Sequence, residues 1–176
     1  MLTVAGAAGG AVSGTLLGAA GGLIPAGTRF AAAMVLGIAV LPVGALAAAG
    51  VRVPVPQWDR ETPQPWLSRG VGVWSMVHGL TLGAGWLTRI EFPAWYVLPV
   101  VAACSGSPSA GALVLGTYGL VRVGMVWPML LGLRHRQGEQ THLSDWLFAH
   151  KDGAHRLGGW VVLVSGLAVA VAYALG

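Results

Sequence analysis

Charged side chains are scarce in this sequence of 176 residues: only 9% are Asp, Glu, Lys or Arg, whereas a soluble domain carries about 25%. Apolar residues make up 55% of the chain. Its positive charge comes from nine arginines and one lysine, nearly all in predicted loops or at predicted helix ends. Charge placed in this way reflects membrane topology and argues against a nucleic-acid partner. We therefore expect a multi-pass protein of the cell (inner) membrane, in contact with the lipid bilayer.

Cysteine is almost absent, because Cys104 is the single one in the chain. This count excludes an intrachain disulfide, a dithiol relay and a metal site with several cysteines. The glycine-rich first run lacks the Lys-Ser/Thr ending that a phosphate-binding loop needs, and no nucleophile triad is recognisable. We expect no resident cofactor and no enzymatic activity.

Long apolar runs dominate what is present. Six of them are predicted to be transmembrane helices, at residues 4–24, 30–50, 70–87, 94–104, 110–133 and 156–175. About 20 apolar residues cross a bilayer core of about 30 Å. The fourth run is short, which is typical of a tilted helix with a loop at the bilayer edge or of a discontinuous helix lining a cavity. The predicted fold is an all-α integral membrane protein with six transmembrane helices.

Small residues, prolines and two polar segments organise these runs. Gly10, Gly14, Gly18 and Gly22 follow one another at four-residue spacing, which allows close helix approach in a membrane. A break is predicted at Pro25 and a kink at Pro42 in the second run. The polar segments lie at residues 51–69, which contain four prolines and suit the headgroup level, and at residues 134–155.

An internal repeat is suggested by short phrases that recur in the second half. Residues 33–41 align with 112–120 with five identities in nine, and the pairs at 66–67 and 79–80 recur at 146–147 and 166–167. The sequence then divides into two three-helix repeats, residues 1–90 and 91–176, within one membrane domain. Three spans per repeat force the two halves to enter the membrane in opposite orientations, as an inverted repeat.

Arg122 is the sharpest candidate for a functional residue, because it lies within the apolar run 110–133. A charge at membrane depth is costly and normally faces a protein interior or a wet cavity. A guanidinium there is suited to binding an oxyanion, with Tyr118 one turn away on the same face. The structural alternatives are that Arg122 pairs with a carbonyl freed by Pro42 or Pro128, or that it reaches the membrane surface.

His78, in the third run, is the second candidate. It could act as a proton relay or an anion-site donor, or make an interhelical hydrogen bond. A haem would need a second histidine at membrane depth, and none is predicted there. The other four histidines lie within or at the end of the second polar segment, at His135, His142, His150 and His155. Their spacing does not place two imidazoles on one helical face, so we interpret them as interfacial residues rather than as a metal site.

The glycine-rich first helices, the break near Pro25 and the phrase from Gly116 to Arg122 resemble the lysine-exporter superfamily of six-span membrane proteins. This grouping includes sulfite-exporter-like proteins and the proteins that pass reducing equivalents for cytochrome c maturation. The electron-passing members use a cysteine in the first helix and another in the fourth. This chain has Cys104 in the fourth run and only Ile24 and Pro25 at the break after the first. The resemblance therefore implies a transport-like member and not a dithiol carrier.

Two functions from different classes fit these features. The first is transport of a small anionic solute, with the chain possibly a homodimer and with Arg122, Tyr118 and His78 lining the path between opposed breaks at Pro25 and residues 105–109. The alternative is a non-catalytic accessory subunit of a larger membrane complex. A transporter should enclose Arg122 and His78 in its own core, whereas a subunit can direct them at a partner. A redox membrane enzyme is a third and less favoured class.

Overall fold

The computed structural model describes residues 1–53, 68–85, 93–124 and 140–175, and within these ranges the chain is helical and contains no β-strand. Its elements, in chain order, are α1 (Leu2–Gly22), α2 (Ala26–Ala48), α3 (Val71–Ala84), the 3-10 turn η2 (Pro93–Tyr96), α4 (Val97–Ser105), α5 (Pro108–Gly124) and α7 (Gln140–Leu175). The all-α class is thus confirmed for the described ranges. Predictions for residues 54–67, including the four prolines, fall outside them, as does Pro128.

Two of the described helices, α1 and α2, are long and apolar enough to cross a membrane, judged by length and composition alone. The helix α3 is apolar but has only 14 residues. Six spans and an inverted repeat therefore remain predictions. The helix α2 continues through Pro42.

The second polar segment differs from its prediction. The sequence suggests a boundary at Arg156, but α7 begins at Gln140 and runs through that position as a single helix of 36 residues. At 1.5 Å per residue it is about 54 Å long, which exceeds the bilayer core of about 30 Å. The cause is that residues 140–155 lack proline, so the rise in polarity changes the surroundings of the helix without ending it.

Glycine and proline set the other helix boundaries. The helices α3 and α4 each end at a glycine with positive φ, Gly85 at 78° and Gly106 at 60°, where a residue with a side chain would be strained. The helix α5 begins at Pro108, a position that needs no N–H donor. Ser107 precedes it and accepts a hydrogen bond through its hydroxyl oxygen from the N–H of Ala110 at 3.4 Å.

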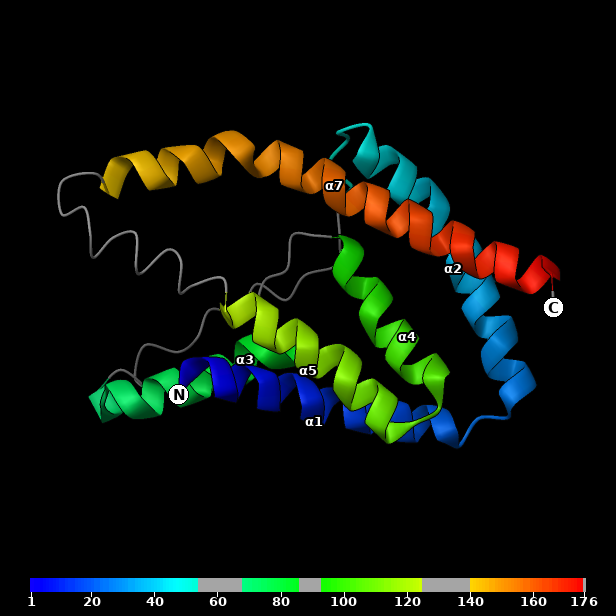
Figure 1. The fold of residues 1–176 in the computed structure, drawn as a ribbon, viewed down its shortest axis with the longest axis horizontal. Helices are drawn as coiled ribbons and strands as arrows, with labels where there is room; N and C mark the ends of the chain where they lie inside the picture. The colour runs from blue at the N-terminus through cyan, green and yellow to red at the C-terminus, as the bar shows by residue number, and fades with distance from the viewer. Residues whose placement is uncertain (54–67, 86–92, 125–139, 176) are drawn as a thin grey trace.

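The helix α1 lies in a group with α5, α3 and α4 (Figure 1). Its glycines touch neighbouring backbones directly. A Cβ at Gly14 would collide with the carbonyl of Gly111 on α5, and one at Gly9 with the carbonyl of Leu80 on α3. The same holds for Gly10 against Leu115. The predicted close approach of small residues is therefore present, and it places α1 between α5 and α3.

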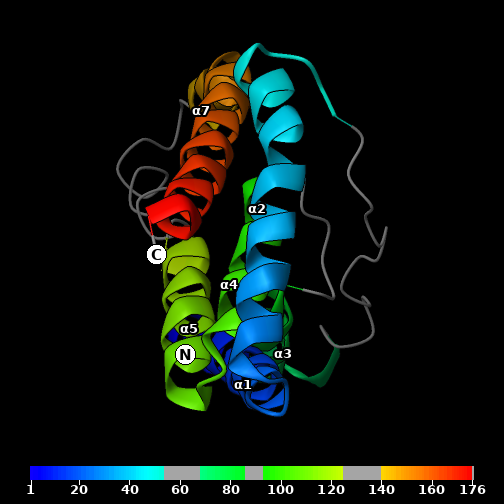
Figure 2. The same ribbon diagram turned by 90° about the vertical axis from the view of Figure 1, so that its right-hand side faces the viewer.

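The helices α2 and α7 form a second pair, which Figure 2 shows side by side along one edge of the molecule. Gly44 lies against the carbonyl of Gly159, where a Cβ would approach its oxygen to 3.1 Å, and Gly166 lies against the carbonyl of Gly37. The helix α4 extends from the α1 group toward this pair (Figure 1). The two most extensive contacts, α1 with α5 and α2 with α7, each join a helix from residues 1–90 with one from 91–176.

Candidate functional site

Arg122 and Tyr118 lie together on α5. The Nη1 atom of Arg122 donates a hydrogen bond to the hydroxyl of Tyr118 at 2.7 Å and one to the carbonyl of Leu82 on α3 at 3.3 Å. The guanidinium carbon lies 5.7 Å from the centre of the Tyr118 ring. Arg122 is in the last described turn of α5 and is partly exposed. The spacing of four residues thus brings the two predicted side chains into direct contact.

The carbonyl that Arg122 binds belongs to the end of α3. Leu82 lies in the last turn of that helix, where carbonyls have no partner within the helix and a cation is favourable. Carbonyls freed by Pro42 or Pro128 were the predicted alternatives, and the described partner is instead this helix end. Trp95 of η2 completes the site: its ring centre is 6.4 Å from that of Tyr118, and its indole lies against Gly85.

His78 lies on α3, one turn before Leu82, so all three predicted site residues belong to the neighbouring helices α3 and α5. Its ring stacks on Trp74 with centres 4.7 Å apart and planes within 13°. The hydroxyl of Thr81 donates to the His78 carbonyl at 2.9 Å. His78 is partly exposed, as Arg122 is.

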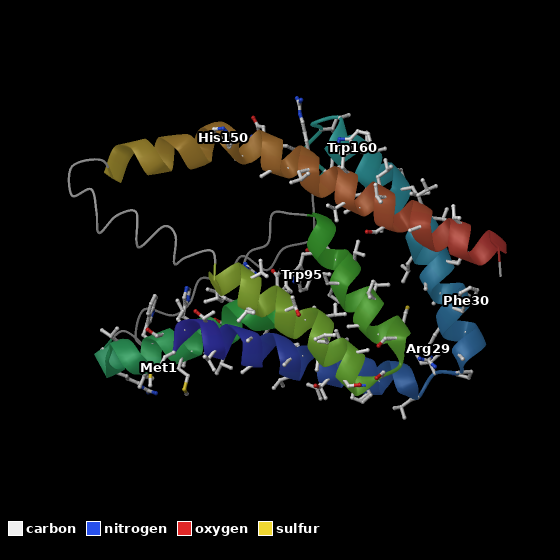
Figure 3. All side chains as sticks on the ribbon, in the orientation of Figure 1. Met1, Arg29, Phe30, Trp95, His150 and Trp160 are labelled. Carbon is white, nitrogen blue, oxygen red and sulfur yellow. The ribbon has the colours of Figure 1, made fainter. Side chains whose placement is uncertain are left out.

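A second site, which was not among the predicted ones, lies at the start of α2 (Figure 3, Arg29). Arg29 donates through Nη1 to the carbonyl of Cys104 at 3.4 Å, and its guanidinium covers Gly106, where a Cβ would collide with it. The Nε atom is buried and has no hydrogen-bond partner. The predicted breaks at Pro25 and at residues 105–109 are therefore neighbours at one end of the molecule.

A signal for Arg29 was present in the sequence. A cation in the first turn of a helix opposes the helix dipole, so another group must hold it there. Here that group is the carboxyl end of α4, a different helix. An apolar pocket of about 320 Å³ opens beside Arg29, between the first half of α2 and α4.

The same arrangement recurs at the end of α2. The guanidinium of Arg156 lies over Gly50, whose φ is 88°, and His155 Nε2 is 3.2 Å from the carbonyl of Val51. Three arginines from α2, α5 and α7 thus each approach the carboxyl end of another helix, and each of these ends carries a glycine with positive φ. The simplest role of such an arginine is to join two helices.

The polar segment around α7 offers no metal site in the residues described. Within the described ranges, no group of three or more His, Cys, Asp or Glu side chains lies close enough together to hold an ion. His135 and the side chain of His142 lie outside the described part. His150 is exposed, and His155 contacts the end of α2.

The chain is similar to two curated proteins with the same name. It is 31% identical over 171 residues to the methylamine utilization protein MauF of Methylorubrum extorquens, an alignment that covers 96% of this chain and 58% of that protein. It is 30% identical over 175 residues to MauF of Paracoccus versutus, covering 94% of the chain and 60% of that protein. The chain therefore spans about three fifths of the relatives' length. No family model matches it, and no solved structure matches it significantly.

These relatives correct the predicted family. They are named as methylamine utilization proteins and not as lysine or sulfite exporters, so the resemblance to the lysine-exporter superfamily is wrong. It rested on glycine-rich helices and a seven-residue phrase, features that unrelated membrane helices share because close packing selects small residues.

Proposed function

We propose that this protein is a non-catalytic accessory subunit of a membrane complex that serves methylamine utilization. The similarity to MauF proteins over nearly the whole chain carries the proposal. The proposal concerns the region that this chain shares with those proteins. The apolar helices α1 and α2 support a membrane location, where the partners of this subunit would also lie.

The placement of the charged groups supports a subunit over a transporter. No polar or charged residue is buried among those whose side chains the structure describes, and Arg122 and His78 are both partly exposed. A transport path through the chain would instead surround such groups with protein or water inside the fold. Here Arg122 is held by a helix end, which is a structural use of its charge.

Exposed large apolar side chains lie on all of the described α-helices, α2 and α7 among them. Phe30 on α2 is 52% exposed and Trp160 on α7 is 56% exposed (Figure 3). Such surface requires lipid or a partner helix against it. A subunit of a membrane complex has lipid against one part of this surface and partner helices against another.

Growth tests the assignment to methylamine utilization. A strain that lacks this protein should fail to grow with methylamine as its nitrogen source and should grow normally on ammonium. Supplying the gene again should restore growth. Normal growth of the deletion strain on methylamine would exclude the proposed role.

The mass of the complex tests the accessory part. The protein is extracted from its own membranes in mild detergent during growth on methylamine, and the polypeptides that purify with it are identified. Other subunits in a fixed ratio are expected. A chain that emerges alone, or only with copies of itself, would contradict this part while leaving the growth result to stand by itself.

A further inference from the structure

The pocket beside Arg29 has the composition of a site for an amphiphile. Three of its lining residues, Arg29, Ala32 and Leu36, follow one another at three- and four-residue spacing along one face of α2, and Thr28 lies beside Arg29. The opposite wall is formed by α4 from Pro99 to Cys104. Its volume of about 320 Å³ lies at the lower end of the range for small-molecule sites. Apart from Arg29, Thr28 and the Cys104 thiol, the walls are apolar.

The charge of Arg29 lacks a counterion in the described structure. Among the side chains described there, the one carboxylate is that of Asp152, which pairs with Arg52 beyond the far end of α2 at 3.3 Å. A guanidinium has five N–H donors, and Arg29 uses Nη1 on a carbonyl while its buried Nε is unsatisfied. Because Nε is buried, an anion would bind at Nη2, which makes no hydrogen bond in the described structure and can form a charge-assisted contact.

The position of the site fits a lipid. Arg29 lies in the first turn of α2, the helix with the highest apolar content among the candidate spans, so a membrane crossed by α2 has its headgroup level near Arg29. Leu36, two turns further along, is 41% exposed at the edge of the groove, so an acyl chain can enter from the side. The charge of Arg29 lies at one end of the groove, and the walls along the rest of the groove are apolar.

We propose that this groove binds one anionic phospholipid, with its phosphate at Arg29 and an acyl chain between α2 and α4 along Ala32 and Leu36. The proposal rests on the membrane location and not on the role in methylamine utilization. Bound lipid would join the α2–α7 pair to α4, whose direct packing on α2 is slight.

Cys104 lines the groove and is the single cysteine of the chain. The rate of its alkylation therefore measures how far the groove is occupied, and no other thiol contributes to the signal. The protein is placed in nanodiscs of phosphatidylcholine, with or without phosphatidylglycerol, and the rate at which a maleimide alkylates Cys104 is measured. Phosphatidylglycerol should slow alkylation of the wild type. The Arg29→Gln variant should need about tenfold more phosphatidylglycerol for the same protection, because a charge-assisted contact is lost.

Arg52→Gln is the matched control, because Arg52 is an exposed arginine near the other end of α2. It should retain the protection seen in the wild type. A second variant, Leu36→Trp, keeps Arg29 but fills the apolar part of the groove, so it tests the acyl chain even if Arg29→Gln does not fold. This variant should carry fewer phosphatidylglycerol adducts in native mass spectrometry.

Three results would overturn the proposal. The first is an equal rate of Cys104 alkylation with and without phosphatidylglycerol. The second is an equal loss of this protection in Arg29→Gln and Arg52→Gln. The third is slower alkylation of the detergent-solubilised protein in the presence of inorganic phosphate alone. Failure of the protein to enter nanodiscs would contradict the membrane location itself. None of these measurements depends on methylamine, so their outcome is separate from that of the growth test.

Discussion

The guanidinium of Arg122 donates a hydrogen bond to the hydroxyl of Tyr118, four residues earlier on α5, at 2.7 Å. The same nitrogen also donates to the Leu82 carbonyl at 3.3 Å, so the two side chains act as one unit at the end of α3. This unit links α5 to α3, two helices that both pack on α1.

Removing either member of the unit should destabilise the fold in a coupled way. We expect Tyr118→Phe to lower the free energy of unfolding by about 1 kcal/mol, and Arg122→Gln by about 1–3 kcal/mol because the Leu82 carbonyl also loses its donor. The double variant should lose less than the sum, by about 0.5 kcal/mol or more. Unfolding in mixed detergent micelles measures the cycle. Strict additivity would show that the 2.7 Å contact does not couple the two residues.

The glycines of α1 should tolerate no side chain where they face another backbone. Gly14→Ala places a methyl group against the Gly111 carbonyl, and we expect a loss of about 1–3 kcal/mol of unfolding free energy from overpacking. Gly153→Ala on α7, where nothing lies within 4 Å, is the control and should be neutral or gain up to about 1 kcal/mol. If the two variants behave alike, α1 does not pack as described.

Gly85 combines a strained backbone position with a close neighbour. A Cβ there would lie 2.5 Å from Cζ2 of Trp95, so Gly85→Ala should displace the indole and change tryptophan fluorescence. Gly70→Ala separates the two effects, because Gly70 also has positive φ but has open space around it. The free energy of unfolding of both variants should fall by about 1–3 kcal/mol because of backbone strain. Only Gly85→Ala should alter the emission, and an unchanged spectrum would contradict the contact with Trp95.

The ion pair between Arg52 and Asp152 should contribute little. Both side chains are about 70% exposed, and such pairs contribute from about 0 to 1 kcal/mol. Asp152→Asn should therefore leave the unfolding free energy within about 1 kcal/mol of the wild type, with a smaller effect still at high salt. Arg156→Gln, which removes the guanidinium over Gly50, should lower the unfolding free energy more than Asp152→Asn does. The reverse order would mean that the exposed pair holds α7 to the end of α2.

Local patterns were sufficient to predict much of the fold. The run of Gly10, Gly14 and Gly18 predicted close helix contact, and the spacing of Tyr118 and Arg122 predicted their adjacency. Both follow from the 3.6-residue period of one helix, a property of the local sequence. The bounds of α1 and α2 lie within a few residues of the predicted spans, because Pro25 and Gly50 interrupt the apolar runs.

The rest depended on contacts between distant parts of the chain. Arg29 and Cys104 are 75 residues apart, and neither residue type alone predicts that one caps the helix containing the other. The carbonyl partner of Arg122 likewise belongs to a helix 40 residues earlier. The start of α7 was wrong for a different reason: polarity indicates the solvent around a helix, while only backbone chemistry ends it.

The length of α7 has a mechanical consequence. A helix without an internal break transmits a displacement from one end to the other, because bending it would stretch its hydrogen-bond ladder. Its second half meets α2 at Gly159 and Gly166 with backbone against backbone, which leaves no side-chain layer to absorb the motion. A displacement applied near Gln140 would therefore move α2 as well, so that the two helices shift as one rigid pair.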